Sequence, residues 1–324
     1  MSQRESCVCC KTKKKLPELI YPKVSVIVRS YNSEKYVKTA VDSVLNQDYS
    51  GEIEVVICYD EGSTDNTLKI LESIVQSRTP NKSVKLIRHK HTSLFDALTT
   101  YGFSNVSGDY VTFLDYDNLF PQAYIRKVVQ QATDRCIRLL FTKARLIDRN
   151  ASDLGTYLMR VPKDFHNVRK LMLRNYMDTN TIFIRCDCLK PIAFRLRMLT
   201  NSFYHEIHPD WLLSMLALRS CDVEYLDDVE VRYRIHESNV AVSTYIGISR
   251  DLHLLNLEKD FRTLTVFKYL DGENLDVSER LYLHLALLEK LILIFVLKWL
   301  IGRRAFSAIH RIFAKHVRFL ERAL

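Results

Sequence analysis

A predicted strand that ends in two carboxylates is the feature that most constrains how this chain can fold. Val111-Thr-Phe-Leu114 has the apolar, β-branched and aromatic side chains of a buried strand, and Asp115 and Asp117 follow it directly. Three similar runs precede it in the chain, at residues 24–28, 55–58 and 84–87. The middle runs are too apolar for a strand with a solvated face, so we expect a sheet that is covered on both sides.

Helical patterns separate these runs. Apolar residues recur at the helical spacing over residues 37–45, after Ser33, and over residues 68–75, after Asp65. We expect Ser33 and Asp65 to cap the two helices. Strands that alternate with helices predict an α/β fold with a mostly parallel, doubly wound sheet. Ligands of such sheets bind beyond the carboxyl ends of the strands, which is where the two carboxylates lie.

Residues at two predicted strand ends indicate what kind of ligand binds. Carboxylate oxygens suit Mg²⁺ or Mn²⁺, ions that proteins usually share with substrate phosphates, so Asp115 and Asp117 can serve a cation site. A solvated turn before Pro121 is the alternative for this pair. Asp60 ends another predicted strand and precedes Gly62 and a helix start. A carboxylate at this place can accept a hydrogen bond from a nucleobase, while the glycine allows close approach of the backbone.

Five segments, in this order, resemble glycosyltransferase family 2, whose members have the GT-A fold. They are Val24-Ser-Val-Ile-Val-Arg-Ser-Tyr-Asn32, Ala40-Val-Asp-Ser-Val-Leu-Asn-Gln47, Asp60-Glu-Gly-Ser-Thr-Asp-Asn-Thr67, Ser107-Gly-Asp-Tyr-Val-Thr-Phe-Leu-Asp-Tyr-Asp117 and Tyr233-Arg-Ile-His236. The resemblance covers roughly residues 23–240 and is strongest in the N-terminal half. It implies transfer of a sugar from a nucleoside diphosphate sugar to an acceptor, with inversion of configuration and with Mn²⁺ or Mg²⁺ as cofactor.

The resemblance also assigns roles to individual residues. The nucleotide sugar would be contacted by residues at the ends of three predicted strands, namely Ser30, Tyr31, Asn32, Asp60, Asp115 and Tyr116. Asp60 resembles the carboxylate that reads the base, and Asp115 resembles the one that contacts the ribose or a metal-bound water. Asp117 resembles the direct metal ligand, and Asp115 and His236 complete the metal site that the resemblance implies.

Sugar transfer by a single in-line displacement also needs a base that takes the proton of the acceptor hydroxyl. In the family this base is the aspartate of a Glu-Asp pair at the start of a helix, and Asp210 in residues 208–216 resembles it. Pro209 stands where relatives have the glutamate, so Asp210 could instead merely cap the helix. Glu206 and His205 are the alternatives for the base.

The donor and the acceptor are less constrained. Relatives often carry an Arg or Lys on the third helix, but residues 93–102 have none, so Arg88, Lys90 or His91 would have to substitute. The resemblance implies a uridine diphosphate sugar as the commonest donor and leaves guanosine and deoxythymidine diphosphate sugars open. The acceptor would be a glycan, glycolipid, glycoprotein or lipid phosphate. It would meet residues 144–206, where no residue type is diagnostic.

The composition divides the chain into three parts. They are a basic N-terminal extension at 1–22, a catalytic domain at 23–245 with a nucleotide-sugar half (23–120) and an acceptor half (121–245), and a C-terminal helical region at 246–324. The net charge of +9 suits phosphate-bearing partners. Nucleic acid is disfavoured, because the basic residues are interspersed with acids except near the C-terminus. The charged N-terminus is unlike a signal peptide, which predicts a cytoplasmic location.

The C-terminal helical region leaves two interpretations open. Residues 281–301 are nearly long and apolar enough to span a membrane, but Glu289, Lys290 and Lys298 favour a buried or interfacial helix. Residues 302–324 follow with a basic amphipathic pattern. This pattern fits peripheral contact with an anionic membrane, and it equally fits a helix that packs on the domain or on a second subunit of a homodimer.

Eight cysteines lie mostly in apolar segments, so we expect buried thiols rather than disulfides. A four-sulfur zinc site from Cys7, Cys9, Cys10, Cys186 and Cys188 would lack the two-residue spacing of zinc knuckles. Two other functional classes remain for this fold, a nucleotide-binding protein without catalysis and a nucleotidyltransferase. The intact carboxylate pair argues against the first class. The lack of a Gly-rich basic loop after the first predicted strand argues against the second.

Overall fold

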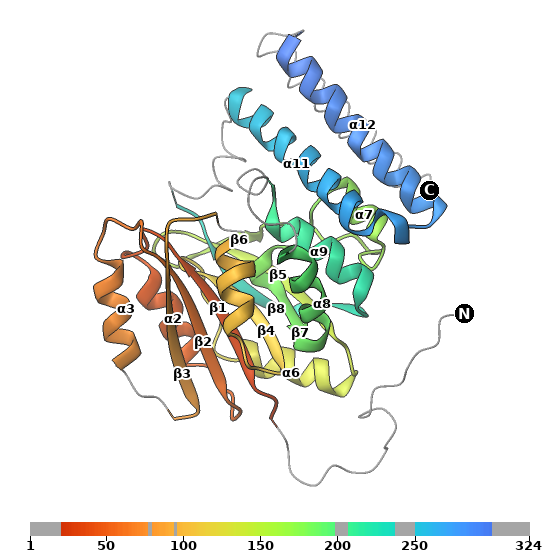
Figure 1. Ribbon diagram of the computed structural model, residues 1–324. Coiled ribbons are helices and arrows are strands. Elements are labelled where there is room, and N and C mark those ends of the chain that lie inside the picture. The colour runs from red at the N-terminus through yellow and green to blue at the C-terminus, as the bar shows by residue number, and fades with distance from the viewer. Residues whose placement is uncertain (1–20, 77–79, 94–95, 198–206, 237–249, 300–324) are drawn as a thin grey trace.

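The computed structural model describes residues 21–76, 80–93, 96–197, 207–236 and 250–299, and it is built on one mixed β-sheet (Figure 1). Half of the sheet is parallel, in the order β3-β2-β1-β4, with β1 at Val24–Ser30, β2 at Ile53–Asp60, β3 at Lys82–His89 and β4 at Tyr110–Asp115. The four predicted strands are therefore confirmed, as is the mostly parallel α/β sheet. Because parallel strands end at the same edge, the carboxyl ends of β1, β2 and β4 share one edge of the sheet.

The other half of the sheet is mixed. Next to β4 lies β7 (Ile182–Arg185), which is antiparallel to it, and β5 (Leu139–Ile147) pairs with the far side of β7. The strand β6 (Asp153–Tyr157) is antiparallel to β5, whereas β8 (Val223–Arg234) is parallel to it. The isolated pair Leu119↔Arg232 then brings the segment after β4 against the end of β8. The sheet thus places His236, just beyond β8, near the carboxylates that follow β4.

Helices cover both faces of the sheet. The helical segments are α2 (Val37–Leu45), α3 (Thr67–Gln76), η1 (Ala97–Gly102), α5 (Phe103–Asn105), α6 (Tyr124–Asp134), α7 (Val168–Leu173), η2 (Thr179–Thr181), α8 (Cys186–Arg197), α9 (Pro209–Ser220), α11 (Arg250–Asp271), η4 (Gly272–Asn274) and α12 (Val277–Trp299). One apolar cluster joins the sheet to α2, α3 and α6. A second cluster joins the opposite face to α7, α8 and α9. Two buried layers therefore hold the edge of the sheet in place.

Three local expectations can be compared with the structure. Asp65 does cap a helix, because its Oδ1 accepts a hydrogen bond from the Thr67 N–H at 3.1 Å. The expected Ser33 cap is wrong: a turn precedes α2, and the Ser33 hydroxyl bonds the Ser30 hydroxyl at 2.6 Å instead. The expectation of no solvated face fails for β3, an edge strand with exposed Ser83 and Lys85, because a strand paired on one side only keeps contact with water.

The Ser107-Gly108 segment is structural and fastens the sheet edge opposite to the carboxylates. Glu54 is fully buried, and its carboxylate accepts hydrogen bonds from Ser25 and from the Ser107 N–H and hydroxyl. These bonds and Lys85 outweigh burial and lower the pKa of Glu54 to about 2. A Cβ on Gly108 would lie 2.7 Å from the Ser25 nitrogen, so glycine is needed at this position.

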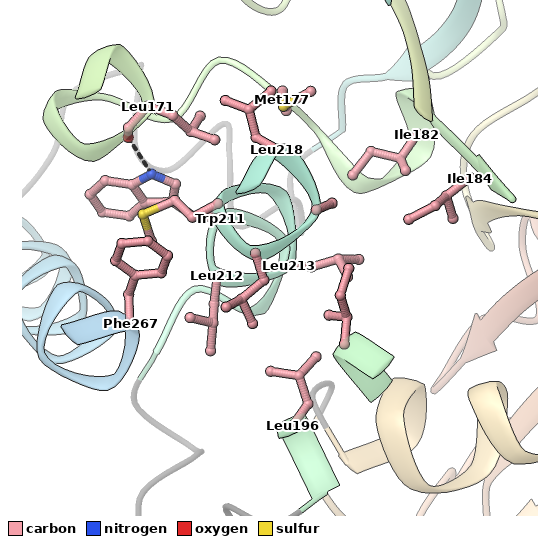
Figure 2. Packing of buried hydrophobic residues seen from close by; sticks show 14 of the residues in the cluster. Leu171, Met177, Ile182, Ile184, Leu196, Trp211, Leu212, Leu213, Leu218 and Phe267 are labelled. Carbon is pink, nitrogen blue, oxygen red and sulfur yellow. Dashed lines mark hydrogen bonds between the residues drawn. The ribbon is translucent and has the colours of Figure 1, made fainter. Parts of the chain in front are cut away.

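The helix that carries Asp210 is held in the second cluster. Trp211 lies against Leu171 and Phe267, and its indole N–H donates a hydrogen bond to the Leu171 carbonyl at 2.6 Å (Figure 2). Every residue from Trp211 to Leu218 is buried. The backbone at Asp210, one residue earlier, is therefore held rigidly.

The C-terminal helices α11 and α12 form an antiparallel pair that rises from this second cluster (Figure 1). Leu264 and Phe267 of α11 are buried in the cluster, as are Tyr282 and Leu283 of α12. The pair is thus anchored on the domain at one end. Within the described residues, no helix is both long and apolar enough to cross a membrane.

The cysteines differ from expectation at one place. Cys188 of α8 and Cys221 after α9 form a disulfide, so the expectation of thiols alone is wrong for this pair. Proximity explains the difference: α8 and α9 pack together, although 33 residues separate the two cysteines. Cys188 is therefore not available for zinc, and Cys186 carries a free thiol. Cys7, Cys9 and Cys10 lie outside the described residues.

Candidate functional site

Asp115 is held on both of its oxygens. It lies beside Arg29 in the register of β1 and β4, and its Oδ1 accepts hydrogen bonds from the Arg29 guanidinium, with the Nε at 2.9 Å. Its Oδ2 accepts from the Asn180 amide at 3.0 Å, and its own N–H donates to the Asn180 Oδ1 at 2.6 Å. Burial alone would lower the pKa of Arg29, but Asp115 outweighs it and raises that pKa. Arg29 and Asp115 therefore form a partly buried ion pair.

Asp117 and His236, 119 residues apart in the chain, lie together as the resemblance implied. Asp117 is 7% exposed, and its Oδ2 is 2.9 Å from the His236 Nε2. Burial raises the pKa of Asp117, the hydrogen bond from His236 opposes the rise, and the charge of Asp115 adds to it. The Tyr36 ring lies against the imidazole, with 5.0 Å between the ring centroids.

Arg234 ties this corner of the site to the β5–β6 turn. Its Nε donates to the Asp117 carbonyl at 2.8 Å, and its Nη1 donates to the Arg149 carbonyl at 2.9 Å. Its guanidinium carbon lies 4.8 Å from the centroid of the Tyr36 ring. The Asn118 side chain accepts from the Arg234 N–H at 2.9 Å. One buried side chain thus fixes the loop after β4 and the end of β8 together.

The chemistry of this corner fits a divalent cation shared with a ligand. The Tyr36 hydroxyl is buried and finds no hydrogen-bond partner among the described residues, which indicates that a further group belongs beside it. Asp117 offers a carboxylate oxygen and His236 an imidazole, which suit Mn²⁺ and also Mg²⁺ on the carboxylate side. In the described part of the chain, no three His, Cys, Asp or Glu side chains gather closely enough to hold an ion. Phosphate and water oxygens would have to supply the remaining ligands.

Asp60 forms the opposite wall of the site. It is 5% exposed at the end of β2, and it accepts hydrogen bonds from the Gly62 N–H at 2.8 Å and the Thr92 N–H at 3.3 Å. The His91 Nδ1 lies 3.0 Å from the Asp60 Oδ2, and the His91 ring lies 5.2 Å from the ring of exposed Tyr31. A Cβ on Gly62 would come within 2.9 Å of His91, so the turn requires glycine.

Arg88, Lys90 and His91 were the proposed substitutes for the Arg or Lys that relatives carry on the third helix. Of these three residues, His91 contacts Asp60. Arg88 instead pairs with Glu72 on α3 at 2.6 Å. Lys90 is exposed beside it. The structure therefore brings together Asp60, Tyr31 and His91. A nucleobase could hydrogen-bond to the Asp60 carboxylate and stack against the two rings.

Ser30, Asn32 and Tyr116 line the floor between these walls. The Ser30 hydroxyl is buried against Ser33, and the Asn32 side chain accepts from the Thr64 N–H at 2.8 Å. Asn32 has a φ of 44°, a left-handed conformation that asparagine tolerates better than most residues. Burial, then Asp117 and then Asp115, raise the pKa of Tyr116 to about 12, so its hydroxyl keeps its proton at neutral pH.

On the acceptor side, Asp210 is the second residue of α9 and lies one position inside the helix, after the cap residue His208. Its carboxylate is partly exposed and accepts a hydrogen bond from the Asn175 amide at 2.9 Å. Asp210 is therefore held by a side chain from another loop, and it is not the cap residue of its helix. The two alternatives for the base, Glu206 and His205, lie outside the described residues.

Asp178 is a site residue that sequence reasoning missed. Its Oδ1 accepts from both the Asn180 N–H and the Asn180 amide, at 2.9 and 2.7 Å, so Asn180 bridges Asp178 and Asp115. Burial, then the charge of Asp115, and further that of Asp210, raise the pKa of Asp178 to about 7, although the Asn180 hydrogen bonds oppose the rise. The polar run 178–181 before an apolar strand was a visible signal, but none of the five family segments contains it.

Comparison with known proteins agrees with this geometry. The family model described as "Glycosyl transferase family 2" matches residues 25–195. An uncharacterized glycosyltransferase of Haemophilus influenzae is 27% identical over 69% of this chain and 68% of its own length. The Escherichia coli UDP-Glc:alpha-D-GlcNAc-diphosphoundecaprenol beta-1,3-glucosyltransferase WfgD is 21% identical over 72% of this chain and 85% of its own length. For several other bacterial relatives the match spans half of their length or less.

Solved structures have the same fold. S. aureus TarS residues 1–349, in complex with UDP-GlcNAc, superposes with a TM-score of 0.53 at 17% identity, over 83% of this chain and 80% of that one. The mannosyltransferase PcManGT of Pyrobaculum calidifontis, in complex with GDP-Man and Mn²⁺, gives a TM-score of 0.52 at 17% identity, over 93% and 84% of the two chains. At such identities the likeness concerns the fold alone.

Proposed function

Because the chain belongs to glycosyltransferase family 2 and is a nucleotide-sugar glycosyltransferase, we propose that it transfers one sugar from a uridine diphosphate sugar, with inversion, in a reaction that requires Mn²⁺ or Mg²⁺. Residues 23–245 form the catalytic unit in this proposal, with the donor in the 23–120 half and the acceptor in the 121–245 half. The observation that carries it is the buried Asp117–His236 pair beside Tyr36, whose hydroxyl finds no hydrogen-bond partner among the described residues, at the same sheet edge as Asp60.

In this proposal the donor lies along the carboxyl ends of β2, β1 and β4. Asp60 accepts a hydrogen bond from the base, and Tyr31 and His91 cover the base from the exposed side. Asp117 and His236 would hold the cation, whose charge would neutralise the departing diphosphate. Asp115 already accepts bonds on both oxygens, so it contacts the ribose or a metal-bound water and does not bind the ion directly.

Asp210 is the base in this mechanism. Its partly exposed carboxylate lies at a rigid helix start and is oriented by Asn175, which leaves it able to accept the proton of an acceptor hydroxyl. The oxygen then attacks the anomeric carbon from the side opposite the diphosphate, and the proton stays on Asp210.

For the acceptor, we propose a glycan that is linked to a lipid, and a protein that works peripherally at the cytoplasmic face of a membrane. The relative WfgD, whose name specifies a diphosphoundecaprenol-linked acceptor, supports this class. The basic residues 302–324 support it as well, since they suit an anionic surface. A homodimer would also suit the amphipathic pattern of this segment, which lies outside the described residues.

A calorimetric titration tests the donor and the metal site. UDP, GDP and dTDP are titrated into the full chain with and without Mn²⁺. We expect Mn²⁺-dependent binding of UDP, weakened by about 100-fold in Asp117→Asn. Asp109→Asn is the matched control, because Asp109 is an exposed residue just before the opposite end of β4. Binding that does not depend on Mn²⁺ would refute the metal assignment, and no nucleotide binding at all would refute the proposed donor site.

A further inference from the structure

The water-facing side of α12 is apolar. Between residues 277 and 296, nine side chains are exposed, and seven of them are Val277, Leu281, Leu285, Leu288, Leu291, Ile292 and Phe295. The other two are Arg280 and His284, and none of the nine is acidic. Leu281 and Phe295 are 57% and 56% exposed. A surface helix in contact with water normally shows the opposite arrangement, because its apolar stripe faces the core.

Between residues 277 and 296, the charged side chains of α12 other than Arg280 are at least partly buried. The Lys290 Nζ lies 3.3 Å from Asp260 on α11, and the other oxygen of Asp260 lies 3.2 Å from the His208 Nε2. Burial lowers the pKa of Lys290, but Asp260 and then Glu289 outweigh it and raise that pKa, so Lys290 stays charged. This ion pair pins one side of α12 to α11 and fixes which side is presented to the surroundings.

The width of the exposed face distinguishes between partners. At 100° per residue, its seven apolar residues occupy an arc of about 120°. A seam between two coiled helices uses only two positions in seven and is narrower. A broad convex face suits immersion in a fluid apolar layer better than contact with one other helix.

The charged residues around this face indicate which kind of membrane surface it would contact. Lys268 of α11 lies 3.2 Å from the exposed His284, with Arg280 one turn away, so the polar border on this side is basic. The chain continues from α12 into residues 302–324, which contain six Arg or Lys and a single acid, Glu321. Basic residues next to an apolar helix face are attracted to anionic lipid headgroups.

We propose that the exposed face of α12 is the surface by which this protein lies on an anionic membrane, with the helix in the plane of the interface and not across it. The assignment rests on the membrane location proposed above, and it names the surface responsible. Leu281, Leu285, Leu288, Ile292 and Phe295 enter the boundary between headgroups and acyl chains, while Arg280 and Lys268 meet the headgroups.

Vesicle flotation of the full chain tests this surface. The probes are vesicles of phosphatidylcholine alone and with phosphatidylglycerol. We expect the wild type to float with the anionic vesicles only, and Leu285→Ser/Leu288→Ser to lower the bound fraction at least tenfold, to roughly the extent that two lost leucines predict. Phe194→Ser is the matched control, because Phe194 is 66% exposed on α8 and should bind as the wild type does.

Three experimental results would overturn the proposal. If the wild type is a dimer by analytical ultracentrifugation and the double variant is a monomer, a second copy covers α12. If the double variant floats as well as the wild type, the basic residues 302–324 act without α12. Flotation needs no nucleotide, so a protein that binds UDP but no vesicles refutes this surface and leaves the proposed reaction intact.

Discussion

The two sides of the candidate site hold their carboxylates in different ways. On the nucleotide side, Asp115 is paired with the Arg29 guanidinium, which is a cation. On the acceptor side, Asp178 and Asp210 accept hydrogen bonds from the amides of Asn180 and Asn175. Neutral amides stabilise a buried carboxylate less than a cation does.

This difference separates binding from chemistry. Asp115 has a cation as its fixed partner, whereas burial, and then the negative charges of Asp115 and Asp210, raise the pKa of Asp178 to about 7. The acceptor side therefore holds one carboxylate, that of Asp178, which can take up a proton near neutral pH. Four substitutions can break or sharpen this comparison.

The largest effect is expected for Asp210→Asn. The variant keeps the hydrogen bond geometry toward Asn175 but cannot accept a proton, so the transfer rate should fall by roughly 10²-fold to 10⁴-fold. Binding of UDP with Mn²⁺ should not change, because Asp210 belongs to the other side. Single-turnover transfer and calorimetry give the two readouts. A near-normal rate would assign the base to another residue.

Arg29→Met should have the next largest effect, on stability. It leaves Asp115 partly buried without its cation, which destabilises a protein by about 3–5 kcal/mol. Urea unfolding measures the loss of unfolding free energy. Arg29→Lys, which keeps the charge, should lose clearly less. A loss under about 1 kcal/mol would show that Arg29 stabilises the Asp115 carboxylate no better than amides stabilise the carboxylates of the acceptor side.

Asp178→Asn should stabilise the protein, with a characteristic pH dependence. The pKa of Asp178 is raised from 3.8 to about 7 in the folded state, so folding loses stability as pH rises from about 4 to 7. Asparagine removes this loss, and we expect a gain of about 1–3 kcal/mol above pH 7 and none near pH 4. Thermal unfolding of the metal-free protein across this range measures it. A gain that is equal at all pH values would show that Asp178 is not the group that titrates.

The smallest effect is expected for His91→Ala. The change removes a ring that lies against Tyr31 and contacts Asp60, which should weaken UDP binding by about 1 kcal/mol, or roughly fivefold. Arg88→Ala is the matched control, because Arg88 pairs with exposed Glu72 instead. If the control weakened binding more than His91→Ala, Arg88 would be the substitute for the missing helix Arg or Lys.

The nucleotide side was predictable because its residues follow strands directly. Asp60 and Asp115 end apolar runs, and the parallel order of these runs places both at one edge of the sheet. The family resemblance added His236, which does lie beside Asp117. Asp60, Asp115 and Asp117 thus needed only the sequence to be located, whereas their catalytic roles stay predictions.

The acceptor side was less predictable because long-range packing creates it. Nothing in the sequence shows that Asn180 bridges Asp178 and Asp115, since the bridge depends on β7 pairing with β4 in the antiparallel sense. The expected Ser33 cap failed for a similar reason. The Ser33 hydroxyl is bonded to the Ser30 hydroxyl, and the Ser33 N–H donates to the Thr67 hydroxyl, so contacts with other elements occupy both groups. The apolar exposed face of α12 also needed coordinates, since its helical pattern alone does not tell which side α11 covers.

Arg234 couples the loop after β4 to the β5–β6 turn. Its guanidinium holds the carbonyl of Asp117 and that of Arg149 in the β5–β6 turn, so the turn cannot shift without disturbing the cation corner. A ligand that moved this turn would therefore change the affinity of the Asp117 corner for a cation, and by linkage the cation would change the affinity for that ligand by the same factor. The binding of that ligand and of the cation would then be coupled, although neither needs to touch the other.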